Sequence, residues 1–140
     1  MQEMSEYEAQ AEAVRKELGF EIKIAFKGDK CPIWCDGGHC HGDRYRVTIK
    51  RNGSSYSFDF WNSRRDLDLG NTPGSYDILS CLEFYTEPDL EEFVREFGYE
   101  IDSVASFKKV EKIHKACLKM STALERLFNE EEIRKLQEIQ

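Results

Sequence analysis

The sequence lacks several features that define common classes of protein. It has no apolar run near the roughly 20 residues that span a bilayer. Its polar, acidic N-terminal segment, MQEMSEYEAQAEAVRKELG, is unlike a secretory signal. Positive charge is also scarce, with 20 Lys and Arg against 27 Asp and Glu and a net charge of −7. We therefore expect a cytosolic protein that, taken as a whole, binds nucleic acid poorly.

The composition is that of a folded domain. With 140 residues, 40% of them hydrophobic and 34% charged, the chain can form one core but not two independent ones. We expect a single domain, 1–140, with a sheet at 20–61 and a helical part at 75–140. Five cysteines in a reducing compartment indicate metal ligation or burial before disulfides.

The first half of the chain predicts a helix followed by three strands. Ser5 and Glu8 form a capping box for a helix over 5–18, which Gly19 ends. Phe20, Ile22, Ile24 and Phe26 then alternate with polar residues, which is typical of a strand with one buried face. Residues 28–43 are a Gly-rich loop, and Asn52-Gly53 indicates a type I′ hairpin over 45–61.

The second half changes to a helical period. A polar connection, 62–74, precedes a short helix over Tyr76 to Tyr85, and Thr86 is expected to cap another helix that ends at Gly98. The longest helix spans about 103–127, and Asn129 begins the last one. The order predicts an α+β fold: an N-terminal helix, a three-stranded antiparallel sheet with a zinc loop, then a cluster of about four helices.

The loop between the first two strands concentrates metal-binding side chains. Thiolate and imidazole are the ligands that zinc prefers, and a structural site fills its tetrahedron with four protein ligands. Such a loop has few apolar residues to order it, so a metal would supply order that packing cannot. We expect four of five residues to bind one zinc ion: Cys31, Cys35, His39, Cys40 and His41.

The spacing leaves the ligand set open. Because adjacent side chains usually point apart, one choice is Cys31, Cys35, His39 and His41. A preference for thiolates favours the three cysteines with one histidine. A structural site is expected, since a catalytic one needs an open coordination position and a nearby general base, and the only acids between Cys31 and Asp43 are Asp36 and Asp43 itself. An unliganded or redox-active loop is the alternative.

Other reactive side chains have ordinary explanations. Cys81, Cys117 and His114 lie on apolar helical stripes, which favours a role in the core. Tyr56, Phe58 and Phe60 share one strand face and are expected to pack on helices rather than stack on bases. Basic residues that could contact phosphate follow the hairpin strands, on the faces opposite the apolar residues: Arg44, Arg46, Lys50 and Arg51.

Charge is distributed unevenly along the chain. Between Glu83 and Asp102 there are eight acids and one base, Arg95. These acids form either a solvated face or a surface that meets a basic partner. The residues expected to bind such a partner are Glu83, Glu87, Asp89, Glu91, Glu92 and Glu96, with Glu100 and Asp102 continuing the block.

Two stretches, HGDRYRVTIKRNGSSYSFDFWNS and PGSYDILSCLEFYTEPDLEEFVREFGYEIDS, resemble a family of small proteins from phages, prophages and conjugative elements of Gram-positive bacteria. The resemblance covers roughly residues 39–140. A small acidic phage protein with a zinc loop is similar to a type II-A anti-CRISPR metalloprotein. The resemblance implies a non-enzymatic inhibitor that binds the type II CRISPR effector nuclease in the host bacterial cytosol. The alternatives are a small zinc-stabilised nucleic-acid-binding regulator, using the basic strand face, and a zinc hydrolase.

Overall fold

The computed structural model describes residues 6–29, 42–63 and 73–139. Helix α1 (Glu6–Leu18) is followed by strands β1 (Glu21–Asp29), β2 (Gly42–Arg51) and β3 (Ser54–Ser63). The helices α2 (Ser75–Leu79), α3 (Leu90–Phe97), α4 (Val104–Leu127) and α5 (Glu130–Gln137) complete the chain. The α+β prediction is therefore confirmed, and none of the described helices is long and apolar enough to cross a membrane.

The three strands form one antiparallel sheet in the order β1-β2-β3. Asn52 and Gly53 both have positive φ, 51° and 81°, so the type I′ hairpin predicted from this dipeptide is confirmed. Strand pairing puts Val47 opposite both Ile24 and Phe58, which makes one apolar row across the sheet. This row and the next one towards the hairpin form the apolar face of the sheet.

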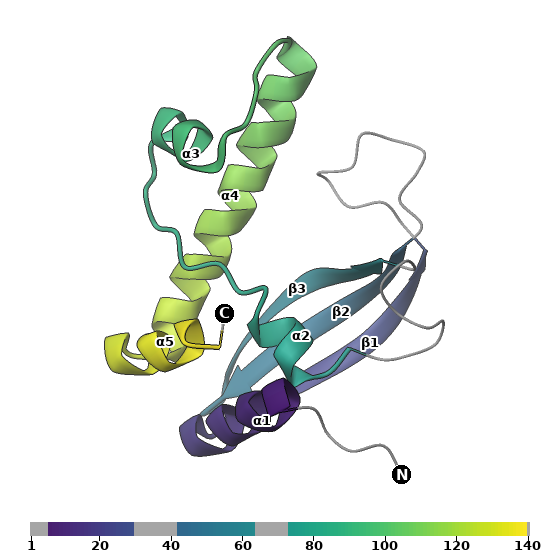
Figure 1. Ribbon diagram of the computed structural model, residues 1–140, viewed down its shortest axis with the longest axis vertical. Coiled ribbons are helices and arrows are strands. Elements are labelled where there is room, and N and C mark those ends of the chain that lie inside the picture. Colours follow the sequence, from purple (N-terminus) through teal and green to yellow (C-terminus); the bar gives the residue numbers. More distant parts are fainter. Residues whose placement is uncertain (1–5, 30–41, 64–72, 140) are drawn as a thin grey trace.

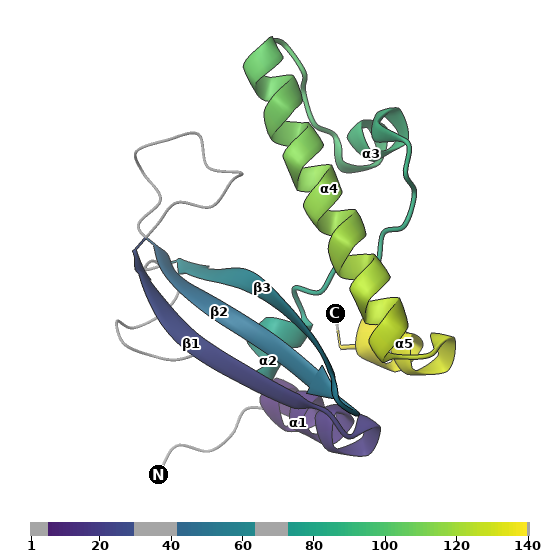
Figure 2. The ribbon, with the colours of Figure 1, turned by 180° about the vertical axis from the view of Figure 1, so that it is seen from behind.

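Helices α1 and α2 lie over that apolar face (Figure 1). Seen from behind, the strands lie in front and no described helix covers them (Figure 2). The main core joins the sheet to helices α1, α2, α4 and α5 through side chains that are fully or nearly fully buried. They include Val47, Ile49, Ile78, Leu79, Leu124 and Leu136.

A second, smaller core lies at the far end of α4. Phe93 of α3 packs there with Val110 and Cys117 of α4, and Tyr85 and Tyr99 surround them. Helix α3 and the upper half of α4 extend away from the sheet (Figure 1). The acidic part of the chain is thus presented at a distance from the main core.

Two large apolar residues are exposed, and one of them, Phe26, was predicted to lie on the buried face of the first strand. Phe26 is 62% exposed. Helices α1 and α2 cover β1 only beside Ile22 and Ile24, and Phe26 lies further along the strand, just before the irregularity at Gly28. Phe107 is 40% exposed, because the contact of α3 with α4 extends only as far as Val110.

The segment after α2 is the largest departure from the predicted secondary structure. A helix was expected from Tyr76 to Tyr85, but α2 ends at Leu79 and residues 82–89 are not helical. The expected cap at Thr86 is also wrong, because the Asp89 side chain accepts a hydrogen bond from the Glu91 N–H and α3 begins at Leu90. Gly98, in the left-handed conformation with φ 70°, ends α3 as predicted.

Candidate functional site

The segment 82–89 runs along α4 and is hydrogen-bonded to it at three places. The Glu83 N–H donates to Met120 Sδ at 3.2 Å, and the Ser121 hydroxyl donates to the Glu83 carbonyl at 2.9 Å. Further along, His114 Nε2 lies 2.9 Å from the Glu87 carbonyl oxygen. Because a carbonyl can only accept, Nε2 carries the proton. These bonds replace the helical bonds that the sequence predicted for this segment.

His114 is a packed histidine, as predicted. It is 4% exposed and stacks on Phe93 with ring centroids 4.6 Å apart. Tyr85 lies edge-on to the same imidazole at 6.3 Å, and its ring also contacts Phe93 and Phe97. The histidine therefore fixes both the backbone at Glu87 and the ring of Tyr85.

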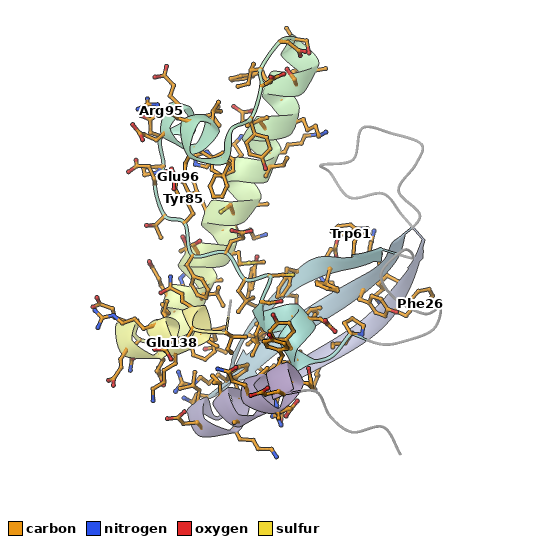
Figure 3. All side chains as sticks on the ribbon, in the orientation of Figure 1. Phe26, Trp61, Tyr85, Arg95, Glu96 and Glu138 are labelled. Carbon is orange, nitrogen blue, oxygen red and sulfur yellow. The ribbon has the colours of Figure 1, made fainter. Side chains whose placement is uncertain are left out.

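The phenol of Tyr85 lies among carboxylates. Its pKa is raised first by partial burial and then by the negative charges of Glu87, Glu92, Glu96 and Asp89. Side chains from the extended segment and from α3 therefore converge on one ring, and Figure 3 shows Tyr85 and Glu96 close together there. We call these four acids with Tyr85 the acidic cluster; its members are Tyr85, Glu87, Asp89, Glu92 and Glu96.

The structure separates the predicted acidic residues into two groups. All six are exposed, but only four belong to the acidic cluster. Glu91 lies on the first turn of α3. The Glu83 charge instead adds to burial in raising the pKa of Tyr99 and of Cys117, and burial raises the pKa of Glu83 itself. Arg95 pairs with Glu92 at 3.0 Å and reduces the negative charge locally.

The two cysteines assigned to the core differ. Cys117 is buried, and burial together with the Glu83 charge raises its pKa to about 11. A thiol with so high a pKa stays protonated at neutral pH, which is the opposite of an activated nucleophile. Cys81 is exposed, so its assignment to the core is wrong. The reason is that α2 ends at Leu79, so Cys81 does not lie on the helical stripe that was predicted.

The proposed zinc ligands, Cys31, Cys35, His39, Cys40 and His41, lie outside the described residues. The strands on either side constrain the segment that contains them, since Asp29 of β1 pairs with Asp43 of β2. The chain thus leaves and re-enters the sheet at adjacent positions. No group of three or more His, Cys, Asp or Glu elsewhere in the described residues could hold a metal ion.

The basic strand face carries less free charge than the sequence predicts. Arg46 and Arg44 both approach Asp59, at 3.1 and 3.9 Å. Arg51 was expected among the residues that contact phosphate. Because side chains alternate along a strand, Arg51 lies instead with Val47 and Ile49 on the face of the sheet that the helices cover. Its guanidinium binds Glu132 of α5.

The aromatic residues of β3 serve the core. Phe58 is 8% exposed, and Tyr56 and Phe60 are partly buried against the main core. This confirms that the β3 aromatics pack on helices, and a base would have no free ring face on Phe58 to stack on.

Comparisons of the chain with models of known protein families, with curated proteins and with solved structures find no match. The fold and the acidic cluster therefore define an α+β protein with an acidic projection, and its function must be inferred from its own residues.

Proposed function

We propose that this chain is a non-enzymatic, zinc-stabilised protein-binding inhibitor that disables a type II CRISPR effector nuclease. The acidic cluster is the surface that binds, and the bacterial cytosol is where binding occurs. Zinc, held by four of Cys31, Cys35, His39, Cys40 and His41, orders the loop beside the sheet. It takes no part in chemistry under this proposal.

The observation that carries the proposal is the acidic cluster, in which partial burial raises the pKa of Tyr85 and the charges of four exposed carboxylates raise it further. Like charges repel, so such a grouping costs free energy in the isolated protein unless solvent screens it. A positively charged partner would relieve that repulsion and would associate faster because of the field. The Tyr85 ring adds an aromatic anchor of the type enriched at binding hot spots.

A nuclease that holds nucleic acid has the positively charged channel that such a surface fits. An acidic protein seated in that channel would exclude the nucleic acid without cutting anything. The raised pKa of Cys117, and the use of His114 as a hydrogen-bond donor to backbone, agree with a binding role rather than with nucleophilic catalysis.

The test is a cleavage assay with a purified type II CRISPR effector nuclease, guide RNA and target DNA. The wild-type chain should inhibit cleavage. A double charge reversal, Glu87→Lys with Glu96→Lys, should weaken inhibition by about a hundredfold, since each close charge pair at such an interface is worth about 1.5 kcal/mol or more. Glu96 lies in the last turn of α3, where a cation is favourable. Glu87→Lys removes the hydrogen bond that the Glu87 carboxylate accepts from the Asp89 N–H at 3.3 Å, so thermal unfolding of the variant checks that α3 stays folded.

A matched control reverses two charges elsewhere. Glu125→Lys with Glu138→Lys changes the net charge equally, but these exposed residues lie near the other end of α4 and on the C-terminal cap of α5. Figure 3 shows Glu138 well away from Glu96. The control should inhibit like the wild type. Equal inhibition by both variants would exclude the acidic cluster as the binding surface, and an inert wild type would exclude the proposed target.

The second candidate function is a nucleic-acid-binding regulator. One observation favours it: no described helix covers the sheet face that carries Arg46 and Lys50 (Figure 2). Pairing of Arg44 and Arg46 with Asp59 weakens it. A gel shift at low salt decides, because this function requires retention that falls when Arg46 and Lys50 are replaced by Ala.

A further inference from the structure

The free end of the α3–α4 hairpin gathers apolar side chains in water. Six large hydrophobic side chains are exposed in the described part of the chain, and four of them lie between residues 97 and 107. We call these four the apolar tip; they are Phe97 (48% exposed), Ile101 (42%), Val104 (71%) and Phe107 (40%). A concentration of this kind marks an interaction surface more often than scattered single residues do.

The four residues lie along one continuous segment, from the end of α3 through the connection to the first turn of α4. The chain leaves α3, runs beside the upper part of α4 and turns at the end of α4 that is furthest from the sheet (Figure 1). Phe97 ends α3 and Val104 begins α4. Val104 and Phe107 are three residues apart on the first turn, so their side chains are neighbours. Below them the same helix continues into the small core at Val110.

The hairpin end is built firmly enough to present these side chains. The Ser103 hydroxyl accepts a hydrogen bond from the Ser106 N–H at 3.1 Å, and Ser106 Oγ accepts from the Ser103 N–H at 3.0 Å. This reciprocal capping fixes the start of α4. At the other side, the Phe97 ring packs on Phe93 with centroids 4.8 Å apart.

Acidic residues lie next to the apolar tip along the chain, while Lys108 lies one turn from Val104 on α4. Glu96, Glu100 and Asp102 alternate with the apolar residues along the chain, and all three are exposed. None of the three forms an ion pair within the described residues, so their charges are available to a partner. The lysines of α4, Lys108, Lys112, Lys115 and Lys119, follow the side of the helix opposite His114 and Cys117.

We propose that the apolar tip is the centre of a docking surface for a protein with an apolar hollow edged by lysine and arginine. This inference rests on the proposed function, because it describes how the same basic partner is held. The acids steer the approach and set the register, while burial of the apolar tip supplies affinity. A second copy of this chain fits less well, since its net charge is −7.

The first experiment measures affinity for the type II CRISPR effector nuclease. Val104→Ser with Phe107→Ser should weaken binding by about tenfold or more, as truncation of central apolar anchors does. Phe26→Ser is the control, because Phe26 is an exposed aromatic residue at the far end of the sheet (Figure 3). Thermal unfolding of each variant checks that the fold is intact. Unchanged affinity in the tip variant overturns this inference and leaves the proposed function standing.

A second experiment does not depend on the nuclease. The isotope-labelled protein is titrated with a short amphipathic Lys/Leu peptide and, separately, with a Lys/Ser peptide of equal charge. Amide shifts should cluster between Glu96 and Phe107 with the Lys/Leu peptide alone. Equal shifts with both peptides, or shifts centred elsewhere, overturn the inference. If the nuclease does not bind at all, the proposed function fails and this titration still judges the apolar tip.

Two other occupants are tested on the same variants. Sedimentation should show a monomer, and a dimer that Val104→Ser with Phe107→Ser abolishes would assign the apolar tip to a second copy. Phosphatidylcholine vesicles should not retain the protein, and retention lost in the same variant would assign it to lipid. Either result overturns the proposal of a basic protein partner.

Discussion

His114 of α4 donates a hydrogen bond from Nε2 to the carbonyl oxygen of Glu87, 2.9 Å away, and thereby ties the acidic segment to the long helix. The two residues are separated by 27 positions in the chain. The bond fixes the backbone from which Glu87 and Asp89 project. The acidic cluster is therefore positioned by a buried side chain that never reaches the surface.

Replacing His114 by Phe should destabilise the α3 region. The ring remains to stack on Phe93, but the Glu87 carbonyl loses its donor, at a cost of about 1–3 kcal/mol. Urea unfolding measures the change, and faster hydrogen exchange in α3 locates it. Lys115→Ala is the control, since this exposed neighbour makes only a 3.8 Å ion pair with Glu111. Unchanged exchange in α3 would show that the bond does not hold the segment.

The bond between Arg51 and Glu132 should make stability depend on pH in acid. The Arg51 guanidinium binds both carboxylate oxygens, and the hydrogen bonds from Arg51 and from the Asn129 N–H lower the pKa of Glu132 from 4.5 to about 2. Because the folded pKa is lower than the unfolded one, the stabilisation is complete above about pH 4.5 and is lost as pH falls to about 2.

Glu132→Gln tests that dependence. The variant should lose about 1.5–3 kcal/mol at neutral pH, as expected for a hydrogen bond to a charged group that also caps α5. Its unfolding free energy should fall less steeply between pH 4.5 and 2 than that of the wild type. Glu138→Gln, on the exposed end of α5, is the control. Parallel pH profiles for wild type and Glu132→Gln would contradict the assignment.

The carboxylate of Glu8 joins α1 to α2 and excludes a side chain at Gly74. It accepts hydrogen bonds from the N–H groups of Ser75 and Tyr76, both at 2.8 Å, and a Cβ on Gly74 would lie 2.7 Å from Glu8 Oε2. Gly74→Ala should therefore displace the carboxylate and cost about 1–2 kcal/mol, comparable to losing a helix cap. The decisive measurement is a double-mutant cycle by thermal unfolding. In a Glu8→Ala background the Gly74→Ala cost should largely disappear, and full additivity would refute the coupling.

The predicted zinc site is tested by metal content. Purified protein should contain about one zinc per chain, and Cys31→Ser with Cys35→Ser should lose the metal and unfold at a lower temperature, because structural zinc contributes directly to folding. Cys81→Ser is the matched control, since Cys81 is an exposed cysteine in the helical part. Zinc-free wild type, or equal zinc in both variants, would end the prediction.

Elements with local signals could be predicted from the sequence. The hairpin follows from Asn52-Gly53. Both turn positions have positive φ, a conformation that asparagine and glycine adopt more readily than other residues. The last helix follows from Asn129, which begins it as predicted and forms a capping box with Glu132. Both signals act over a few residues, so distant parts of the chain cannot override them.

The segment 82–89 could not be predicted because its structure depends on distant residues. Its apolar spacing suits a helix, but the backbone bonds to Met120, Ser121 and His114 outweigh that local preference. The same holds for the acidic cluster. The sequence shows that acids are abundant there, but only the folded chain brings the charges of four of them to act on Tyr85 and that of Glu83 to act on Cys117.

The most direct test of the proposed function is a calorimetric titration of the type II CRISPR effector nuclease with this protein at low and high salt. Binding should weaken with salt, and it should weaken by about a hundredfold in the Glu87→Lys, Glu96→Lys variant but not in the Glu125→Lys, Glu138→Lys control. Binding that is absent, or that is equal in all three proteins, would contradict the proposed function.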